Sequence, residues 1–243
     1  EIWPLPQTGQ MWLEYELLTR PEVPGVFCVS TSYRQEQNPV PGRHKIIFPM
    51  FEFESRGTMD DLRTLEREVC AHVQLGSRDT FVHKAYDDMA AHYGVDELTS
   101  EHEEHMWKDF GRVVFLERFP LKTSPFWNMK RDGTTHAKKI DVIIDGMETI
   151  GSAERSCSPE EMRREFYSIC DGGYAQTLFD LFGRYRVEYE LNQFLSLPFT
   201  PRFGGGIGVT RLVRALNQSY ETNHSCLDIA AAQRTHGSSA FAV

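Results

Sequence analysis

The dipeptide Asp145-Gly146, placed between two short apolar segments, restricts the possible folds more than any other local pattern in this sequence. An Asp-Gly pair is a strong signal for a two-residue turn between antiparallel strands. The sequence therefore predicts a tight β-hairpin over residues 139–151, in which Ile143 faces Glu148. Such a hairpin argues against a sheet built only from parallel strands.

The hairpin also places two carboxylates. Side chains alternate along a strand, so Asp141 should share a sheet face with Ile143 and lie diagonal to Glu148, roughly 5–8 Å away. Carboxylates at that distance repel each other unless a cation lies between them. A site with few protein oxygens suits Mg²⁺ that is also held by substrate phosphates. Two carboxylates on a solvated sheet face fit the hairpin equally well, and both interpretations stay open at this point.

Other segments extend the antiparallel pattern. Residues 26–34 and 45–54 are typical of strands, and the turn-prone loop between them predicts a second hairpin. Residues 58–73 carry apolar side chains at helical spacing, and residues 174–195 predict one long helix. Hairpins separated by helices predict the α+β class, with an antiparallel β-sheet flanked by helices.

The composition is that of a globular chain. With 243 residues, 40% of them hydrophobic and 25% charged, a single domain over residues 1–243 is expected. No apolar run approaches the ~18 residues of a membrane span, and the N-terminus lacks the features of a signal peptide. Five widely spaced cysteines predict a cytoplasmic setting, with neither a zinc site nor a disulfide framework. The formal charge of −9 disfavours a broad electrostatic contact with nucleic acid.

A glycine run, residues 204–208, leads into a helical segment that contains Arg211. Such a junction lets the backbone approach a ligand closely, and the positive end of a helix favours phosphate. The run lacks the Lys-Ser/Thr pair of a Walker loop, and no βαβ unit surrounds it. A plain packing or turn role is therefore an equal alternative.

The hairpin over residues 26–54 carries side chains suited to a nucleotide: Arg34, Glu36, His44 and Phe48. Such residues hold a nucleotide through charge-assisted hydrogen bonds and ring stacking. Each of them taken singly is more typical of a surface or core position.

Residues 101–105 place His102 and His105 one helical turn apart. The sequence positions no third metal ligand beside them, so a solvated, charged helix face is the favoured interpretation. No Gly-x-Ser-x-Gly nucleophile motif is present either.

In combination, these segments resemble the catalytic core of the class II aminoacyl-tRNA synthetases, specifically the asparaginyl and aspartyl branch. The likeness runs in order through residues 4–217 and implies the class II synthetase fold. The matching segments are residues 5–10, similar to the family's amino-acid loop; 32–52, similar to motif 2; 118–127, similar to the next strand of asparaginyl enzymes; 141–155, with the family's Asp, Glu and Arg at matching spacing; and 204–212, similar to motif 3.

The resemblance implies a role for each matching residue. Arg34 and Arg211 are expected to be catalytic, through stabilisation of charge. The implied ATP-binding residues are Arg34, Glu36, His44, Phe48, Glu148 and Arg211, and the implied Mg²⁺ ligands are Asp141 and Glu148. The implied amino-acid ligands are Gln7, Ser152 and Arg155.

The chain also departs from the family's pattern. Ile47 stands where a Glu usually precedes the stacking Phe, and Leu13 and Glu14 stand where a Lys often follows the amino-acid loop. The family's dimer-forming motif 1 is expected before residue 1, which indicates that an N-terminal region is missing from this sequence.

The implied function is an ATP-dependent ligase that activates aspartate or asparagine as an adenylate, with Mg²⁺, as a homodimer. The first hypothesis is an asparagine synthetase-like enzyme with ammonia as the acceptor. The second is the catalytic domain of an asparaginyl-tRNA synthetase with tRNA as the acceptor. The third is a non-catalytic regulatory paralogue, which the departure at Ile47 makes conceivable.

Overall fold

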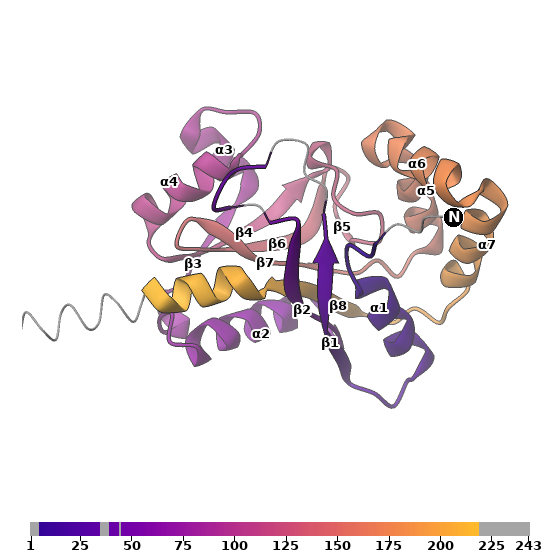
Figure 1. Cartoon of the computed structure of the whole chain (residues 1–243), viewed down its shortest axis with the longest axis horizontal. Helices are drawn as coiled ribbons and strands as arrows, with labels where there is room; N and C mark the ends of the chain where they lie inside the picture. Colours follow the sequence, from indigo (N-terminus) through magenta and orange to yellow (C-terminus); the bar gives the residue numbers. More distant parts are fainter. Residues whose placement is uncertain (1–4, 35–38, 44, 219–243) are drawn as a thin grey trace, which may run out of the picture.

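The computed structural model describes residues 5–34, 39–43 and 45–218, which form a mixed sheet between groups of helices (Figure 1). Within these residues the eight strands follow the order β1-β2-β8-β7-β6-β4-β3, with β5 paired to β6. The pairings are antiparallel except for that of β3 with β4. The strands are β1 (Gly25–Tyr33), β2 (Ile47–Arg56), β3 (Val82–Ala85), β4 (Val113–Pro120), β5 (Arg131–Asp132), β6 (His136–Ile144), β7 (Met147–Glu154) and β8 (Arg202–Gly208).

The helices lie before, between and after these strands. They are α1 (Gln10–Thr19), α2 (Met59–His72), α3 (Tyr86–Tyr93), α4 (Ser100–Phe110), α5 (Pro159–Ser168), α6 (Gly173–Phe182) and α7 (Arg184–Leu195). Residues 209–218 are also helical, and short 3₁₀ turns occur at η1 (Arg78–Thr80), η2 (Leu121–Thr123) and η3 (Ile169–Gly172). In the described part of the chain, no helix is both long and apolar enough to cross a bilayer.

One face of the sheet is covered by α2 and by the helix over residues 209–218, drawn in yellow in Figure 1. Leu62 of α2 and Ala215 of the second helix are buried against Phe115 and Ile150 of the sheet. This apolar layer fixes which side chains of each strand point away from it, toward the other face.

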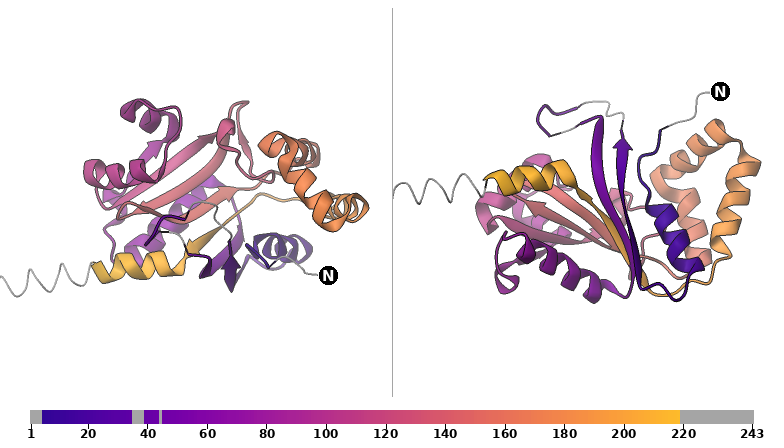
Figure 2. Two further views of the ribbon diagram at one scale, coloured as in Figure 1. Left: turned by 45° about the horizontal axis from the view of Figure 1, so that its top comes forward. Right: turned by 60° about the horizontal axis from the view of Figure 1, so that its bottom comes forward.

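The other face is covered only in part. The helices α3 and α4 pack on it through Met106, Leu116 and Ile143. The helices α5, α6 and α7 form a group beside the sheet with a core of their own, which includes Trp127 (Figure 2). Between these two groups, the sheet face carries the cavity described below.

The hairpin predicted over residues 139–151 is formed by β6 and β7. Its turn has positive φ at Asp145 (47°) and at Gly146 (77°), as a type I′ turn requires. Ile143 pairs with Glu148, as predicted from the turn. The local pattern therefore gave the turn and the adjacent register correctly.

Further along the hairpin the register shifts, because a β-bulge lies between the pairs formed by Val142 and Ile143. Asp141 consequently lies opposite Gly151. The predicted diagonal relation between Asp141 and Glu148 assumes regular pairing along the hairpin, and the bulge interrupts that pairing before Asp141 is reached. The bulge, rather than a regular ladder, sets how the two carboxylates approach each other.

The predicted α+β class is confirmed. The helix predicted over residues 58–73 is formed as α2. The single long helix predicted over residues 174–195 is wrong, because Gly183 adopts a φ of 82° and separates α6 from α7. A positive φ ends the helical hydrogen-bond pattern, and glycine adopts it without steric cost.

Candidate functional site

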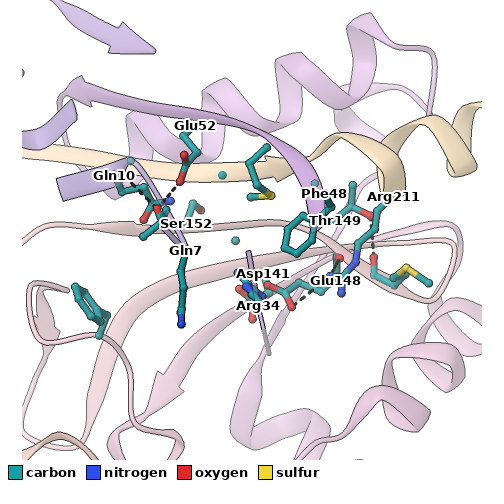
Figure 3. A pocket seen from close by; sticks show the side chains of 18 of the residues that line it. Gln7, Gln10, Arg34, Phe48, Glu52, Asp141, Glu148, Thr149, Ser152 and Arg211 are labelled. Carbon is teal, nitrogen blue, oxygen red and sulfur yellow. Dashed lines mark hydrogen bonds and ion pairs between the residues drawn. The ribbon is translucent and has the colours of Figure 1, made fainter. Parts of the chain in front are cut away.

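The residues predicted to contact substrates gather around one cavity of about 500 Å³ on the sheet face away from α2 (Figure 3). Its walls come from the loop before α1, from β2, β6, β7 and β8, and from the helix over residues 209–218. The predicted residues that line it through their described side chains are Gln7, Arg34, Phe48, Asp141, Glu148, Arg155 and Arg211. Segments far apart in the sequence are thus combined into one site.

The floor of the cavity is the central strand β8, whose alternate residues Gly204, Gly206 and Gly208 border it. A Cβ on Gly204 would lie 2.0 Å from Glu54 Cδ, and one on Gly206 would lie 2.6 Å from Met50 Cε. The missing side chains therefore leave room for residues of the neighbouring strands. The glycine run is a buried strand, and not the turn that was one alternative from the sequence.

The Arg155 end of the cavity is a buried ion pair. Arg155 Nε donates to Glu54 Oε1 at 3.1 Å, and Arg155 Nη2 donates both to the same oxygen and, at 3.4 Å, to Gln10 Oε1. Burial raises the pKa of Glu54 to about 7, although Arg155 acts in the opposite direction. Arg155 is therefore paired with an acidic side chain, Glu54, that the sequence did not identify.

A second buried pair lies beside the first. Arg202 Nε donates to Glu14 Oε1 at 2.9 Å, and Asn128 Nδ2 donates to Glu14 Oε2 at 2.6 Å. Glu14 is one of the positions at which the sequence departs from the resembled pattern. Its carboxylate anchors α1 to the rest of the site instead of facing solvent.

Glu52 of β2 fixes the predicted amino-acid loop. Its carboxylate accepts hydrogen bonds from the Gly9 backbone N–H at 2.9 Å, from Ser30 Oγ at 2.5 Å and from the Thr8 hydroxyl. These bonds hold the segment that carries Gln7 against the cavity. The loop is thus positioned by a buried carboxylate on a neighbouring strand.

The Arg211 end of the cavity carries cationic and aromatic side chains. The Arg34 guanidinium lies 5.3 Å from the centre of the Phe48 ring. Arg211 Nη1 donates to the Glu148 carbonyl oxygen at 2.5 Å and lies 3.8 Å from Glu148 Oε2. Figure 3 shows Phe48 and Arg211 near each other, with Gln10 and Glu52 toward the opposite end.

Asp141 and Glu148 approach each other above Gly151. A Cβ on Gly151 would lie 2.9 Å from Glu148 Oε1 and 3.5 Å from Asp141 Oδ1. Asp141 Oδ1 is buried and has no hydrogen-bond partner among the described residues, whereas Oδ2 accepts from Lys139 Nζ at 2.5 Å. The free oxygens of the two carboxylates fit a hard divalent cation that takes its remaining ligands from phosphates.

Glu103 of α4 connects the site to the helices. It accepts hydrogen bonds from the Arg43 guanidinium and, at 2.6 Å, from the Glu148 backbone N–H. Arg43 also donates to the Gly146 carbonyl oxygen at 3.3 Å. The segment around His102 was predicted to be a solvated helix face, and this prediction is wrong for Glu103, whose side chain is largely buried.

The remaining predicted residues are placed differently. Ser152 borders the cavity, but its hydroxyl donates at 2.6 Å to Glu66 Oε1 on the α2 side of the sheet. The hydroxyl is thus engaged away from the substrate side. Glu36 and His44 lie outside the described residues. No group of three or more potential metal ligands occurs in the part of the chain that the structure describes, so neither His102 nor His105 belongs to one.

Comparison with known proteins identifies what the chain is similar to. The sequence model of the family described as tRNA synthetases class II (D, K and N) matches residues 1–224. The aspartate–tRNA(Asp) ligase of Pyrobaculum aerophilum is 30% identical over 132 residues, which are 54% of this chain and 28% of the ligase.

Solved structures share the fold. The asparaginyl-tRNA synthetase of Pyrococcus horikoshii, complexed with asparaginyl-adenylate, aligns with a TM-score of 0.69 at 22% identity, over 87% of this chain and 53% of that one. The Entamoeba histolytica asparaginyl enzyme, also with asparaginyl-adenylate, gives 0.69 at 21% identity, over 88% and 53%. The Entamoeba histolytica aspartyl enzyme gives 0.66 at 17% identity, over 89% and 50%. The chain therefore spans about half the length of these structural relatives.

Proposed function

Because this chain belongs to the class II tRNA synthetases of the D, K and N family, we propose that it activates aspartate or asparagine with ATP as an aminoacyl-adenylate. The observation that carries the proposal is that one cavity has the buried Arg155–Glu54 pair at one end and Arg34, Phe48 and Arg211 at the other. A cavity with these two ends can hold an amino acid at one and a nucleotide at the other.

At the Arg155 end, the guanidinium is proposed to receive the side-chain end of the amino acid. Gln7 and Gln10 border the same region, and Gln10 already contacts Arg155. Fixed donors in a buried site orient a small polar substrate without reorganisation. The Arg155–Glu54 pair offers both donors and acceptors, which suits either a carboxylate or a carboxamide.

At the Arg211 end, Phe48 is proposed to stack on adenine, Arg34 to hold the α-phosphate and Arg211 the outer phosphates. A substrate carboxylate oxygen then bonds to the α-phosphorus, while the bond to the β-phosphate bridge breaks and pyrophosphate leaves with the electron pair. Arg34 stabilises the charge that develops on the α-phosphate. Glu36 and His44 stay predictions from the sequence, since the structure does not describe them.

Asp141 and Glu148 are proposed to hold Mg²⁺ together with the nucleotide phosphates. The orphaned Asp141 Oδ1 and the nearby Glu148 carboxylate supply the oxygens that this ion prefers. When bound, the ion neutralises phosphate charge and favours departure of pyrophosphate.

For the acceptor of the adenylate, ammonia is proposed first, as in an asparagine synthetase-like enzyme. The net charge of −9 supports a small acceptor over a broad contact with a polyanion. Transfer to tRNA is the second candidate, and the names of the similar ligases and synthetases favour it. The adenylation step is common to both candidates and is therefore tested first.

The test is ATP–pyrophosphate exchange measured with aspartate and asparagine separately. Exchange with one of them is expected, and Arg34→Ala and Arg211→Ala should each reduce kcat/KM at least 100-fold, since each removes a charge from the phosphate site. Arg20→Ala, which removes an exposed partner of Glu16 on α1, is the matched control and should leave exchange unchanged. Absence of exchange with either amino acid would contradict adenylation by this chain.

The acceptor is then decided with the amino acid that supports exchange. Aspartate, ATP and ammonia should give free asparagine if ammonia is the acceptor. Aminoacyl-tRNA formed with unfractionated tRNA, without asparagine formation, would replace the ammonia proposal by the tRNA candidate.

A further inference from the structure

Lys139 was not identified from the sequence, yet it lines the cavity and contacts Asp141. It lies on β6 two residues before Asp141, so both side chains point to the same sheet face. Lys139 Nζ donates to Asp141 Oδ2 at 2.5 Å and lies 3.7 Å from the centre of the Phe119 ring. Its side chain lines the cavity wall.

The Lys139 amine is held there as a cation. Lysine is a cation at neutral pH, and Nζ is hydrogen-bonded to the Asp141 carboxylate. The Phe119 ring adds a cation–π contact on another side. A fixed positive charge therefore already offsets part of the negative charge of the two carboxylates.

That positive charge lies where a metal ion would also be needed. Asp141 Oδ1, the oxygen not used by Lys139, points toward Gly151 and the Glu148 carboxylate. A divalent cation bound there would share the Asp141 carboxylate with the Lys139 ammonium. The ammonium and the divalent cation would repel each other strongly in a buried site.

We propose that Lys139 is the resident counter-ion of the Asp141–Glu148 pair and keeps divalent cations from this pair until nucleotide phosphates enter the cavity. The negative charge of the phosphates then offsets the repulsion, and the metal arrives with the nucleotide. Only the identity of the incoming phosphate ligand rests on the proposed function. The competition between Lys139 and a divalent cation does not.

The test measures Mn²⁺ binding to the full chain without nucleotide or amino acid, by electron paramagnetic resonance of the free ion. Lys139→Met should bind Mn²⁺ at least tenfold more tightly than the wild type, because it removes the competing charge and keeps the length of the side chain. Lys139→Arg keeps the charge and should bind as weakly as the wild type. The double variant Lys139→Met/Asp141→Asn should bind Mn²⁺ no more tightly than the wild type.

The wild-type chain gives a second readout that does not depend on a variant folding. Water proton relaxation enhancement should show protein-bound Mn²⁺ only after α,β-methylene-ATP, which is not cleaved at the α–β bridge, is added. Equal Mn²⁺ affinity of wild type and folded Lys139→Met, or tight wild-type binding without nucleotide, would overturn the proposal.

These outcomes are separable from those of the exchange assay. If Lys139→Met binds Mn²⁺ more tightly but the wild type exchanges no pyrophosphate, the counter-ion proposal holds and the adenylation proposal fails. If the wild type exchanges pyrophosphate but Lys139→Met has the same Mn²⁺ affinity as the wild type, the adenylation proposal holds and the counter-ion proposal fails.

Discussion

Arg155 and Glu54 form an ion pair across the sheet that is almost completely buried, with side-chain exposures of 2% and 0%. Removing one partner of such a pair leaves an uncompensated buried charge. We therefore expect Arg155→Ala to lower the free energy of unfolding by about 3–5 kcal/mol. Urea denaturation followed by circular dichroism measures this change.

The control for this prediction is Arg20→Ala. Arg20 pairs with Glu16 on α1, but their side chains are 61% and 43% exposed. Exposed pairs of this kind contribute about 0.3–0.5 kcal/mol. Equal destabilisation by the two substitutions would contradict the assignment of Arg155 as a buried, charge-balanced residue.

Gly204 is the second position at which a small change should have a large effect. A Cβ there would lie 2.0 Å from Glu54 Cδ, so Gly204→Ala must displace the carboxyl group from Arg155. Overpacking of a rigid core costs about 1–3 kcal/mol, and the disturbed ion pair adds to it. We therefore expect urea denaturation to show that Gly204→Ala lowers the free energy of unfolding by at least about 1–3 kcal/mol.

Gly173→Ala provides the comparison for Gly204→Ala. Gly173 begins α6 with helical φ and ψ (−60° and −34°), and an added Cβ meets nothing closer than 4.0 Å. Alanine in a compatible helical position is neutral or stabilises by about 0.4–1 kcal/mol. A similar loss of stability in both variants would mean that the tight packing at Gly204 does not govern the result.

The hairpin shows what a local pattern can establish. The Asp145-Gly146 turn and the pairing of Ile143 with Glu148 follow from a few adjacent residues. The bulge that places Asp141 opposite Gly151 does not, because β7 is also paired with β8, which follows it by nearly fifty residues. The sequence of the hairpin alone does not show that β7 also pairs with β8.

The glycine run illustrates a different difficulty. Glycines have no side chain to alternate between faces, so β8 lacks the period-two pattern by which strands are recognised. Its place in the centre of the sheet depends on β2 and β7, which lie far away in the sequence. The sequence predicts close approach of a ligand or plain packing; the structure brings Glu54 and Met50 against Gly204 and Gly206, and the approach of a ligand stays a prediction.

The residues most completely missed were the carboxylates that position the predicted site residues. Glu14 pairs with Arg202, 188 positions away, and nothing in the local sequence distinguishes it from an exposed helix glutamate. The resemblance supplied Arg34, Asp141, Arg155 and Arg211 because it rests on spacing within matched motifs. It supplied none of the carboxylates Glu14, Glu54 and Glu103 that hold those motifs in place.

Glu103 gives a prediction that concerns activity. It holds Arg43 and the Glu148 backbone N–H at the Arg211 end of the cavity. Glu103→Ala frees both groups, so we expect the KM for ATP to rise about tenfold, a loss of about 1.4 kcal/mol, with a smaller change in kcat. Pyrophosphate exchange at varied ATP concentration measures the two constants.

The neighbouring Glu104→Ala is the matched control, because Glu104 is exposed on the same helix. It should leave the KM for ATP unchanged. An equal rise in both variants would assign the effect to α4 as a whole, and an unchanged KM in Glu103→Ala would remove Glu103 from the nucleotide site.

Glu66 provides a prediction of pH dependence. It lies buried on α2, where Oε1 accepts from Ser152 Oγ at 2.6 Å and Oε2 has no partner among the described residues. Burial raises the pKa of Glu66 from 4.5 to about 8. A raised pKa means that the folded state binds this proton more tightly than the unfolded state, so the associated stability is complete below pH 4.5 and is lost as pH rises toward 8.

The free energy of unfolding of the wild type should therefore fall between pH 5.5 and 8, with a contribution from Glu66 of up to about 1.4 kcal/mol per pH unit. Glu66→Gln keeps the shape of the protonated side chain and should remove that contribution, so its curve should cross the wild-type curve as pH rises. Glu68→Gln, on the more exposed side of α2, should run parallel to the wild type. Urea denaturation at half-unit pH intervals measures all three curves, and a parallel Glu66→Gln curve would show that Glu66 ionises alike in the folded and unfolded chain.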